Sequence, residues 1–185
     1  MREAVEVIQR LVAGDRSGFA GKRFTLAPGS GLEYQPLRDR IPLMIGTWRQ
    51  RTAQFAAGVA DEVKIGGCAN PDMVRLMRSW LGEDGPRIVV GAVTVVDEDG
   101  EAARAHALAQ VQMYLEVVAE LDPTLEGAEP PLEKFAIAGT PEEVAAHAAT
   151  LFEAGVYRVE FGTPQGISTD GGVELLCDRV LPLLR

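Results

Sequence analysis

Cysteine and histidine are scarce in this chain of 185 residues, and their scarcity limits the chemistry it can carry. The two cysteines, Cys68 and Cys177, lie far apart, which excludes a disulfide framework and gives no basis for a cysteine-based zinc site. The two histidines, His106 and His147, lie in separate helical patterns. We expect both of them to take surface or interhelix positions rather than to bind a metal.

Long apolar runs and clusters of positive charge are also missing. No run approaches the roughly 20 residues that span a bilayer, and the first residues do not resemble a signal peptide. Lysine and arginine number 18 against 27 acidic residues, so the formal net charge is −9, and the basic residues are scattered. We therefore expect no nucleic-acid or membrane partner, and a location in the reducing cytoplasm.

What the chain does have is an alternation of apolar strands and amphipathic helices. Its 46% hydrophobic content is enough for one domain with a core, over residues 1–185. Strands are predicted at residues 63–66, 87–96 and 157–161, and a first one within residues 41–48, where it begins near Ile41 and ends at a tight turn at Gly46 and Thr47. Helices are predicted at residues 2–13, 71–81, 101–121, 141–154 and 172–184, and one more between the first two strands, ending at residue 60. This order predicts an α/β fold with a parallel sheet of about four strands.

Local signals fix several helix starts. Asn70 precedes a proline and an aspartate, and Thr140 opens a capping box that Glu143 completes. The acids at residues 97–99 precede a helix, where they offset the macrodipole, although the same acids would also suit a metal or base cluster. Residues 17–36 form either a loop with a small hairpin or a lid.

Alternation along the strands separates two faces of the sheet. One set should face the helices: Leu43, Ile45, Val63, Ile65, Val159 and Phe161. The other set should face the opposite side: Met44, Lys64, Arg158 and Glu160. Charged side chains there are costly unless they are paired. They would form either a polar substrate chamber or a layer of ion pairs partly open to water.

Three segments, in their order and spacing, carry a family resemblance: IPLMIGTW, AAGVADEVKIGG and AIAGTPEEVAAHAATLFEAGVYRVEFGTP. They resemble the luciferase-like flavin and deazaflavin oxidoreductases, especially the methylenetetrahydromethanopterin reductase branch. The opening REAVEVIQRLVAG, followed by GKRFTL, resembles the family's segment before its fifth strand. The resemblance covers nearly all of the chain, but only the carboxyl-terminal half of the family's (βα)8 TIM barrel.

The resemblance implies hydride transfer or oxygen activation on a small-molecule substrate, with FMN or coenzyme F420 as cofactor. A complete barrel usually takes about 250 residues, so this chain is short for the family. Half of a barrel leaves two strand edges without partners, and we expect a homodimer or higher homo-oligomer to protect or complete them. A truncated product is the other possibility.

The cofactor-binding residues that the resemblance implies fall in three regions. The first, the phosphate-binding loop, is Gly46, Thr47, Trp48, Arg49, Gln50 and Arg51. The others are Gly66, Gly67 and Cys68, and then Gly162 and Thr163. The Gly-Pro pair that the deazaflavin branch usually has near Arg49 and Gln50 is missing. Trp48 suits either a cofactor contact or a hydrophobic cap, and Cys68 suits either a reactive thiol or a small apolar filler.

Two functions follow from the resemblance. The first is an oxidoreductase whose subunits supply the missing walls to one another. The second is a non-catalytic half-barrel that dimerises and at most binds a phosphate-bearing ligand. The family's substrate acids and histidines belong largely to the first half of the barrel, so no catalytic residue is assigned within this chain.

Overall fold

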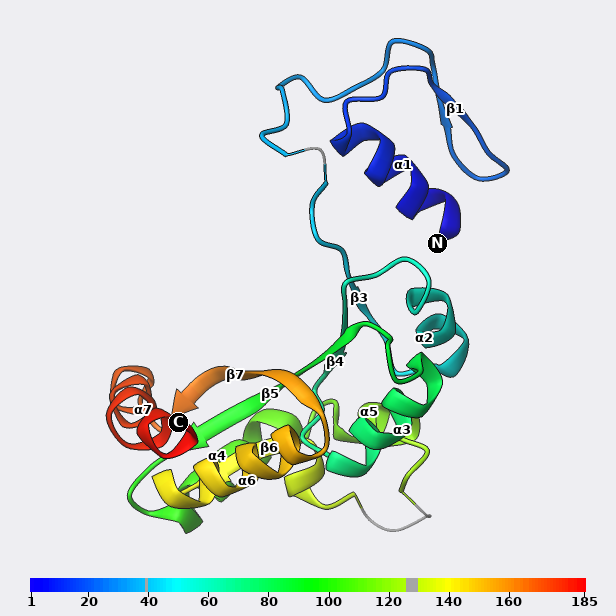
Figure 1. Cartoon of the computed structure of the whole chain (residues 1–185). Coiled ribbons are helices and arrows are strands. Elements are labelled where there is room, and N and C mark those ends of the chain that lie inside the picture. Colours follow the sequence, from blue (N-terminus) through cyan, green and yellow to red (C-terminus); the bar gives the residue numbers. More distant parts are fainter. Residues whose placement is uncertain (39, 126–129) are drawn as a thin grey trace. The chain divides into compact units, whose positions relative to one another are not determined.

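The computed structural model describes residues 1–38, 40–125 and 130–185. These residues form two compact units, Met1–Leu43 and Met44–Arg185, which are coloured dark blue to cyan and cyan to red in Figure 1. The expectation of one domain over residues 1–185 stays a prediction. In the part of the chain that the structure describes, no helix is both long and apolar enough to cross a membrane.

The first unit is a helix with a small hairpin. Helix α1 (Arg2–Val12) ends before Gly14, whose φ of 75° suits the end of a helix. Strands β1 (Phe19–Ala20) and β2 (Thr25–Leu26) pair antiparallel. The carboxylate of Glu3 accepts hydrogen bonds from the backbone N–H groups of residues 22–24, at 2.7 to 3.1 Å. The predicted small hairpin is therefore present, and α1 holds its turn.

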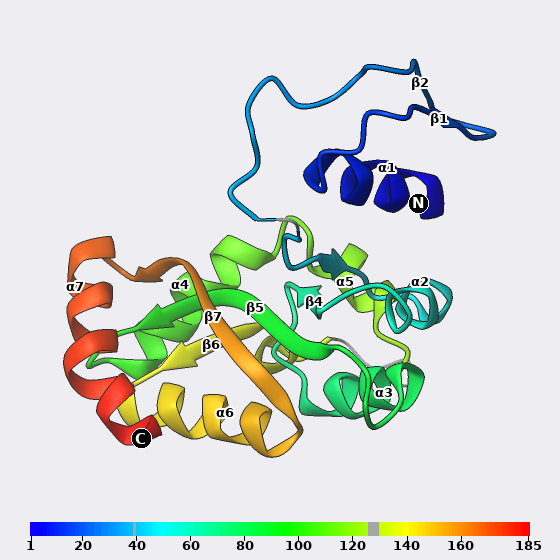
Figure 2. The same ribbon diagram turned by 45° about the horizontal axis from the view of Figure 1, so that its top comes forward.

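The second unit is built on a parallel sheet of five strands, namely β3 (Met44–Gly46), β4 (Glu62–Gly66), β5 (Arg87–Val96), β6 (Ala136–Gly139) and β7 (Val156–Gly166). Strand β5 is central: β4 pairs with its first half, β6 pairs with its second half, and β7 runs along its whole length. Figures 1 and 2 show β7, in orange, beside β5, in green. Among the described residues, β3, β6 and β7 each pair with one neighbour, so each of these strands has an unpaired edge.

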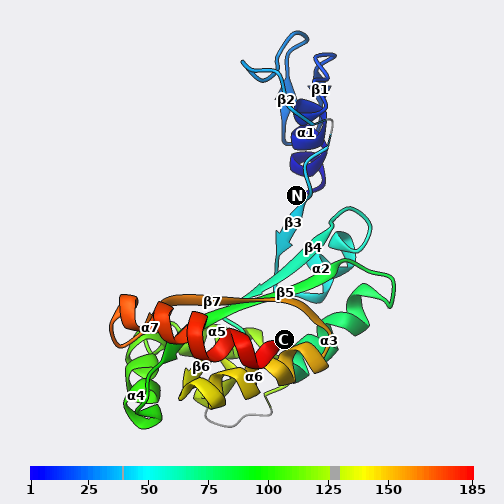
Figure 3. The same ribbon diagram turned by 60° about the vertical axis from the view of Figure 1, so that its left-hand side comes forward.

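Helices connect these strands: α2 (Gln50–Ala56), α3 (Pro71–Leu81), α4 (Gly100–Val111), α5 (Leu115–Leu121), α6 (Pro141–Glu153) and α7 (Thr169–Leu175). Short turns of other helix types cover Leu132–Lys134, Leu176–Val180 and Leu181–Leu184. Helices α4 and α6 lie on the same side of β5 and β7 (Figure 3). The core fills that side, as Val63, Ile65, Ile88 and Val90 are all fully buried.

The helix starts follow the predicted chemistry. The Asn70 side chain accepts the N–H of Asp72 at the start of α3, and Thr140 and Glu143 form the predicted capping box of α6. Asp99 caps α4 by accepting the N–H groups of Glu101 and Ala102. Of the acids at residues 97–99, Asp99 therefore has the structural role at the helix start that was predicted for all three. Among the described residues, no group of acids, histidines and cysteines could hold a metal ion.

Several predicted elements differ from the structure. The sheet has a fifth strand, β6, in a segment too short to show a periodicity of its own. The first strand is confined to Met44–Gly46 and does not begin near Ile41, α2 ends at Ala56 and not at residue 60, and the strand predicted at residues 157–161 extends over Val156–Gly166. The predicted helix at residues 101–121 is interrupted between α4 and α5, where Tyr114 and Leu115 turn toward the core cluster that includes Val95 and Ala136. Packing against β5 and β6 explains the last difference, since a straight helix would carry these side chains away from the sheet.

Candidate functional site

A depression of about 420 Å³ lies where the second halves of β5 and β7 pass the carboxyl end of β4. The carboxyl ends of parallel strands are the usual place for ligands in α/β folds. Strand residues form its floor, and two residues next to and within α5, Tyr114 and Val118, form a wall. The lining is Lys64, Gly66, Gly67, Gly91, Ala92, Val93, Tyr114, Val118, Glu160, Gly162 and Thr163.

Glycines leave parts of the floor of the depression without side chains. A side chain at Gly66 would point into open space, with no atom within 4 Å of its Cβ. A Cβ at Gly91 would lie 3.2 Å from Lys64 Cε and 3.4 Å from Glu160 Cβ. Gly67 has a φ of 71°, which other residues rarely adopt. The backbone is therefore open to a ligand at Gly66, and at Gly91 it makes room for two charged side chains.

These charged side chains belong to a network that crosses three strands. Lys64 pairs with Glu160 at 2.5 Å, and Arg158 lies between Glu160, at 3.4 Å, and Glu62, at 2.8 Å. Arg87 completes the network with a 2.9 Å ion pair to Glu62. The hydrogen bond that Lys64 donates is the main cause that lowers the pKa of Glu160. The hydrogen bond that Arg158 donates to Glu62 is the main cause that raises the pKa of Arg158.

The network confirms that Lys64, Arg158 and Glu160 share the face opposite the helices, whereas Val159 and Phe161, predicted on the helix side, are only half-buried. Met44 is exposed, and Lys64, Arg158 and Glu160 are half-buried, whereas Ile45, Val63 and Ile65 are buried. Two charged residues that no sequence pattern singled out, Glu62 and Arg87, stand at strand ends and pair directly across β4 and β5. Glu62 is only 7% exposed, so its two arginine partners are what makes its burial tolerable.

The predicted phosphate-binding loop, residues 46–51, lies next to the depression. Thr47 N–H donates to the carbonyl oxygen of Lys64 at 2.9 Å, and the Thr47 hydroxyl accepts the N–H of Arg49 at 3.0 Å. Trp48 Nε1–H donates to the Gly66 carbonyl oxygen at 2.9 Å. Among the loop's side chains, those of Arg49, Gln50 and Arg51 are exposed. The loop is thus joined to β4 by two hydrogen bonds, and its two arginines are open to a ligand.

Trp48 and Cys68 are both buried. The Trp48 indole lies 6.5 Å from the Phe135 ring, between ring centroids, and is 9% exposed, so it has a packing role. Cys68 is fully buried, and burial raises the pKa of its thiol to about 12. The interpretation of Cys68 as a small filler is therefore confirmed, because a thiol of that pKa is not a nucleophile near neutral pH.

The structure brings together four of the predicted residues around one depression: Gly66, Gly67, Gly162 and Thr163. Gly46 lies directly beside this group, since a Cβ there would lie 4.0 Å from the Lys64 carbonyl oxygen. Tyr114 and Val118 were missed, because they reach the depression only through the interruption between α4 and α5. Burial raises the pKa of the Tyr114 hydroxyl.

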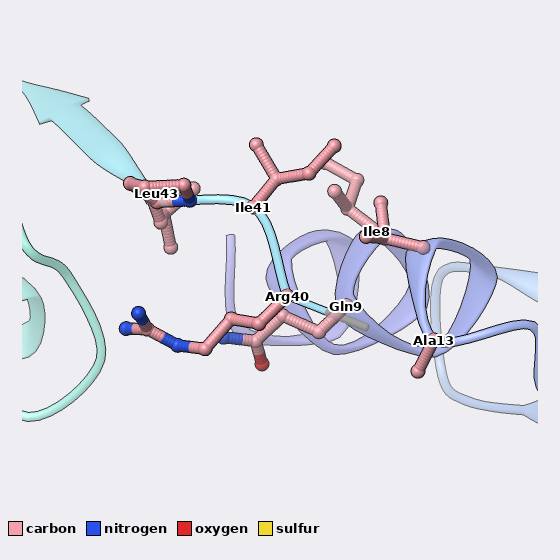
Figure 4. Close-up of a pocket in the computed structure, with 8 residues that line it drawn as sticks. Ile8, Gln9, Ala13, Arg40, Ile41 and Leu43 are labelled. Carbon is pink, nitrogen blue, oxygen red and sulfur yellow. The ribbon is translucent and has the colours of Figure 1, made fainter. Parts of the chain in front are cut away.

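A second cavity, of about 340 Å³, lies within the first unit between α1 and residues 40–43 (Figure 4). Its lining is mostly apolar, with Ile8, Val12, Ile41 and Leu43 among the side chains. None of the predicted site residues lines it. The depression in the second unit therefore remains the candidate site.

An open parallel α/β sheet with a glycine-lined site at its carboxyl edge defines the class of this protein, and comparison with known proteins defines the family. Residues 1–158 match the luciferase-like monooxygenase family. The chain belongs to that family.

Known relatives agree with this assignment. The chain is 26% identical, over 225 aligned positions, to 5,10-methylenetetrahydromethanopterin reductase of Archaeoglobus fulgidus, and the match covers 100% of this chain and 66% of that protein. The coenzyme F420-dependent tetrahydromethanopterin reductase of Methanopyrus kandleri shares the fold with a TM-score of 0.84 and 21% identity. That match covers 100% of this chain and 62% of the Methanopyrus chain.

A solved structure that holds a different cofactor shares the fold too. The oxygenating constituent of 3,6-diketocamphane monooxygenase from Pseudomonas putida, solved in complex with FMN, superposes with a TM-score of 0.63 at 13% identity. The match covers 100% of this chain and 62% of that one. The chain thus spans less than two thirds of the relatives that it matches.

Proposed function

We propose that this chain carries the phosphate-binding part of an oxidoreductase of the luciferase-like type, acting with coenzyme F420 or FMN on a small-molecule substrate. One observation carries the proposal: two regions that the family resemblance implies, residues 66–67 and 162–163, meet around one depression. The third region, residues 46–51, is hydrogen-bonded to β4 beside it.

The residues present fit such a cofactor. The open space above Gly66 allows a flat ring to approach the backbone, and the exposed guanidinium groups of Arg49 and Arg51 suit a phosphate. The Thr47 hydroxyl accepts the Arg49 N–H and donates to the Arg49 carbonyl oxygen at 3.4 Å, and it would have to turn that donor to reach the same ligand. When bound, the cofactor would supply the hydride transfer or the oxygen activation. This chain would supply binding and orientation, and Tyr114 and Val118 would exclude water from one side.

Binding measurements on loop variants test this proposal. Thr47→Val and Arg51→Ala should each weaken cofactor binding about tenfold, which corresponds to about 1.4 kcal/mol. Arg75→Ala is the matched control, because it removes an exposed arginine of α3 that pairs with Asp72 outside this region. Unchanged affinity in both loop variants would contradict the assignment of residues 46–51.

The open edges of the sheet favour a second candidate. We propose that the second unit is half of a (βα)8 barrel and that homodimerisation covers the free edges of β3 and β7. In the non-catalytic form of this proposal, the dimer binds at most a phosphate-bearing ligand. Its melting temperature should then fall on dilution, as mass action requires, and no turnover should occur with either cofactor. A melting temperature independent of concentration would argue against the dimer.

A cytoplasmic location belongs to the same proposal. Its support is the pair of free thiols, since Cys68 and Cys177 make no disulfide.

A further inference from the structure

A network of five charged side chains adjoins the depression. Three cations, Lys64, Arg87 and Arg158, share two carboxylates, those of Glu62 and Glu160. Of these five, Lys64 and Glu160 line the depression, and the other residues of its lining are uncharged. Within the described part of the chain, Lys64 is therefore the one cation that a ligand in the depression would meet.

Contacts leave spare hydrogen-bond donors at Lys64. Both carboxylates use both of their oxygens: Glu62 accepts from the two arginines, and Glu160 accepts from Arg158 and Lys64. Arg158 donates to both acids, and Arg87 lies over the Tyr157 ring, 4.2 Å from its centroid, outside the depression. An ammonium has three N–H donors, and among the described residues Lys64 spends one of them, on Glu160.

Geometry leaves space for an anion at this point. The Lys64 side chain lies over Gly91, where a Cβ would be 3.5 Å from Nζ, so the ammonium faces the floor of the depression. Gly66 pairs with Gly91 in the register of β4 and β5, and the space above it is open. An anionic group above Gly66 could therefore reach the remaining Lys64 donors without moving any backbone.

We propose that Lys64 binds an anionic group of a small ligand, a carboxylate or a phosphate, over Gly66 in this depression. The charge-assisted hydrogen bonds from the ammonium supply the affinity, and Glu160 holds Lys64 in place while competing with the ligand. That this anion belongs to the substrate rests on the proposed oxidoreductase function, whereas anion binding itself does not.

Lysine-selective labelling gives a direct test, because the chain has three lysines, Lys22, Lys64 and Lys134. With 13C-labelled lysine in the full chain, three ε-methylene signals are expected, and the signal lost in Lys64→Met identifies Lys64. Sodium acetate or inorganic phosphate, without added cofactor, should shift the Lys64 signal saturably. Sodium chloride at the same ionic strength is the control. The anion that saturates at the lower concentration distinguishes a carboxylate from a phosphate ligand.

Two further variants test the mechanism. Glu160→Gln should tighten anion binding at least about threefold, because it removes the competing carboxylate and leaves Lys64 without a charged partner. Gly66→Val should abolish the saturable shift by filling the space above the floor, and the signal of Lys64 in the absence of anion should show that the ion pair is kept. If folded Glu160→Gln did not bind the anion more tightly, or if folded Gly66→Val kept the saturable shift, the position assigned to the anion would be wrong.

Three outcomes with the unmodified chain would overturn the proposal: no shift, equal shifts of all three lysine signals, or a chloride effect equal to that of acetate and phosphate. The test separates this proposal from the cofactor proposal. A saturable Lys64 shift without any cofactor binding would retain the anion site and reject the oxidoreductase. Cofactor binding without a saturable Lys64 shift would retain the oxidoreductase proposal and reject the anion site.

Discussion

Lys64 of β4 and Glu160 of β7 form an ion pair across the strand that separates them, above Gly91 of β5. The two strands are not neighbours, so their side chains meet only because the intervening residue has no side chain. This relationship makes Gly91 a structural requirement for the charge network and for the shape of the depression.

Gly91→Val should break this pair. Its Cβ would lie 3.2 Å from Lys64 Cε and 3.4 Å from Glu160 Cβ, and the added methyl groups would extend the clash. We expect a loss of about 1–3 kcal/mol in the free energy of unfolding, measured with urea. Gly66→Ala is the matched control, since its Cβ meets no atom within 4 Å, and its stability should be unchanged or higher. Equal losses in the two variants would show that the ion pair does not depend on position 91.

The two thiols should differ sharply in reactivity. Cys177 is exposed, whereas Cys68 is fully buried with the pKa of its thiol raised to about 12. A disulfide reagent at pH 8 should therefore modify one thiol per chain in the native protein and two in denaturant. In Cys177→Ser, fast modification of the native protein should disappear. Fast labelling of Cys68 in that variant would mean that the segment after β4, which contains Cys68, opens readily.

Asn70 should be among the most sensitive positions of the second unit. It is fully buried, and besides accepting the Asp72 N–H it donates to Asp122 and Thr124, both at 2.8 Å. Asn70→Ala removes the cap and leaves the buried Asp122 carboxylate short of a donor, so we expect a loss of about 2–4 kcal/mol. Thermal or urea unfolding measures it.

Asp99→Ala is the control for that measurement, because Asp99 caps α4 from an exposed position. Its loss should stay near 1 kcal/mol. If the two alanine variants lost the same stability, the buried hydrogen bonds of Asn70 would contribute nothing beyond the cap.

The imidazole of His147 should make stability depend on pH. Its Nε2–H donates to the Ala69 carbonyl oxygen at 2.8 Å, and burial lowers its pKa below the ordinary value of 6.5. The unfolded chain therefore binds a proton at His147 more readily than the folded chain does. The contribution of the neutral imidazole to the free energy of unfolding is fully present above about pH 6.5. It is lost as the pH falls from there toward the lower pKa of the folded state.

Unfolding free energies between pH 5 and 8 check this expectation. His147→Gln retains a hydrogen-bond donor but does not titrate. Its free energy of unfolding should therefore decrease less than that of the unmodified chain as the pH falls below about 6.5. His106→Gln removes the other imidazole without touching the Ala69 carbonyl and should behave as the unmodified chain does. A decrease of the same size in all three proteins would assign it to other groups.

Local chemistry made much of this fold predictable from the sequence. The cap at Asn70, the capping box at Thr140 and the apolar run of β5 each act within a few residues, and their elements formed where the pattern placed them. The alternation in β4 correctly placed Lys64 on the face opposite the helices. These signals depend on neighbouring residues, so they survive without knowledge of the tertiary structure.

Other features depend on residues that are far apart in the chain. Strand β6 forms because β5 offers it an edge, and the interruption between α4 and α5 follows from packing on that pair. The ion pair between Glu62 and Arg158 joins residues 96 positions apart, and no periodicity along either strand reveals it. Tyr114 and Val118 line the site for the same reason, as only the folded chain brings α5 to the ends of the strands.

The central claim is that residues 46–51, with the glycines at the strand ends, form a family-type cofactor site in this chain. The most direct test is a titration of the purified protein with coenzyme F420 and, separately, with FMN, followed by cofactor fluorescence. We expect saturable binding of one of them at a fixed ratio per chain. Binding of neither at about 100 μM, which means an affinity weaker than about −5.5 kcal/mol, would contradict it.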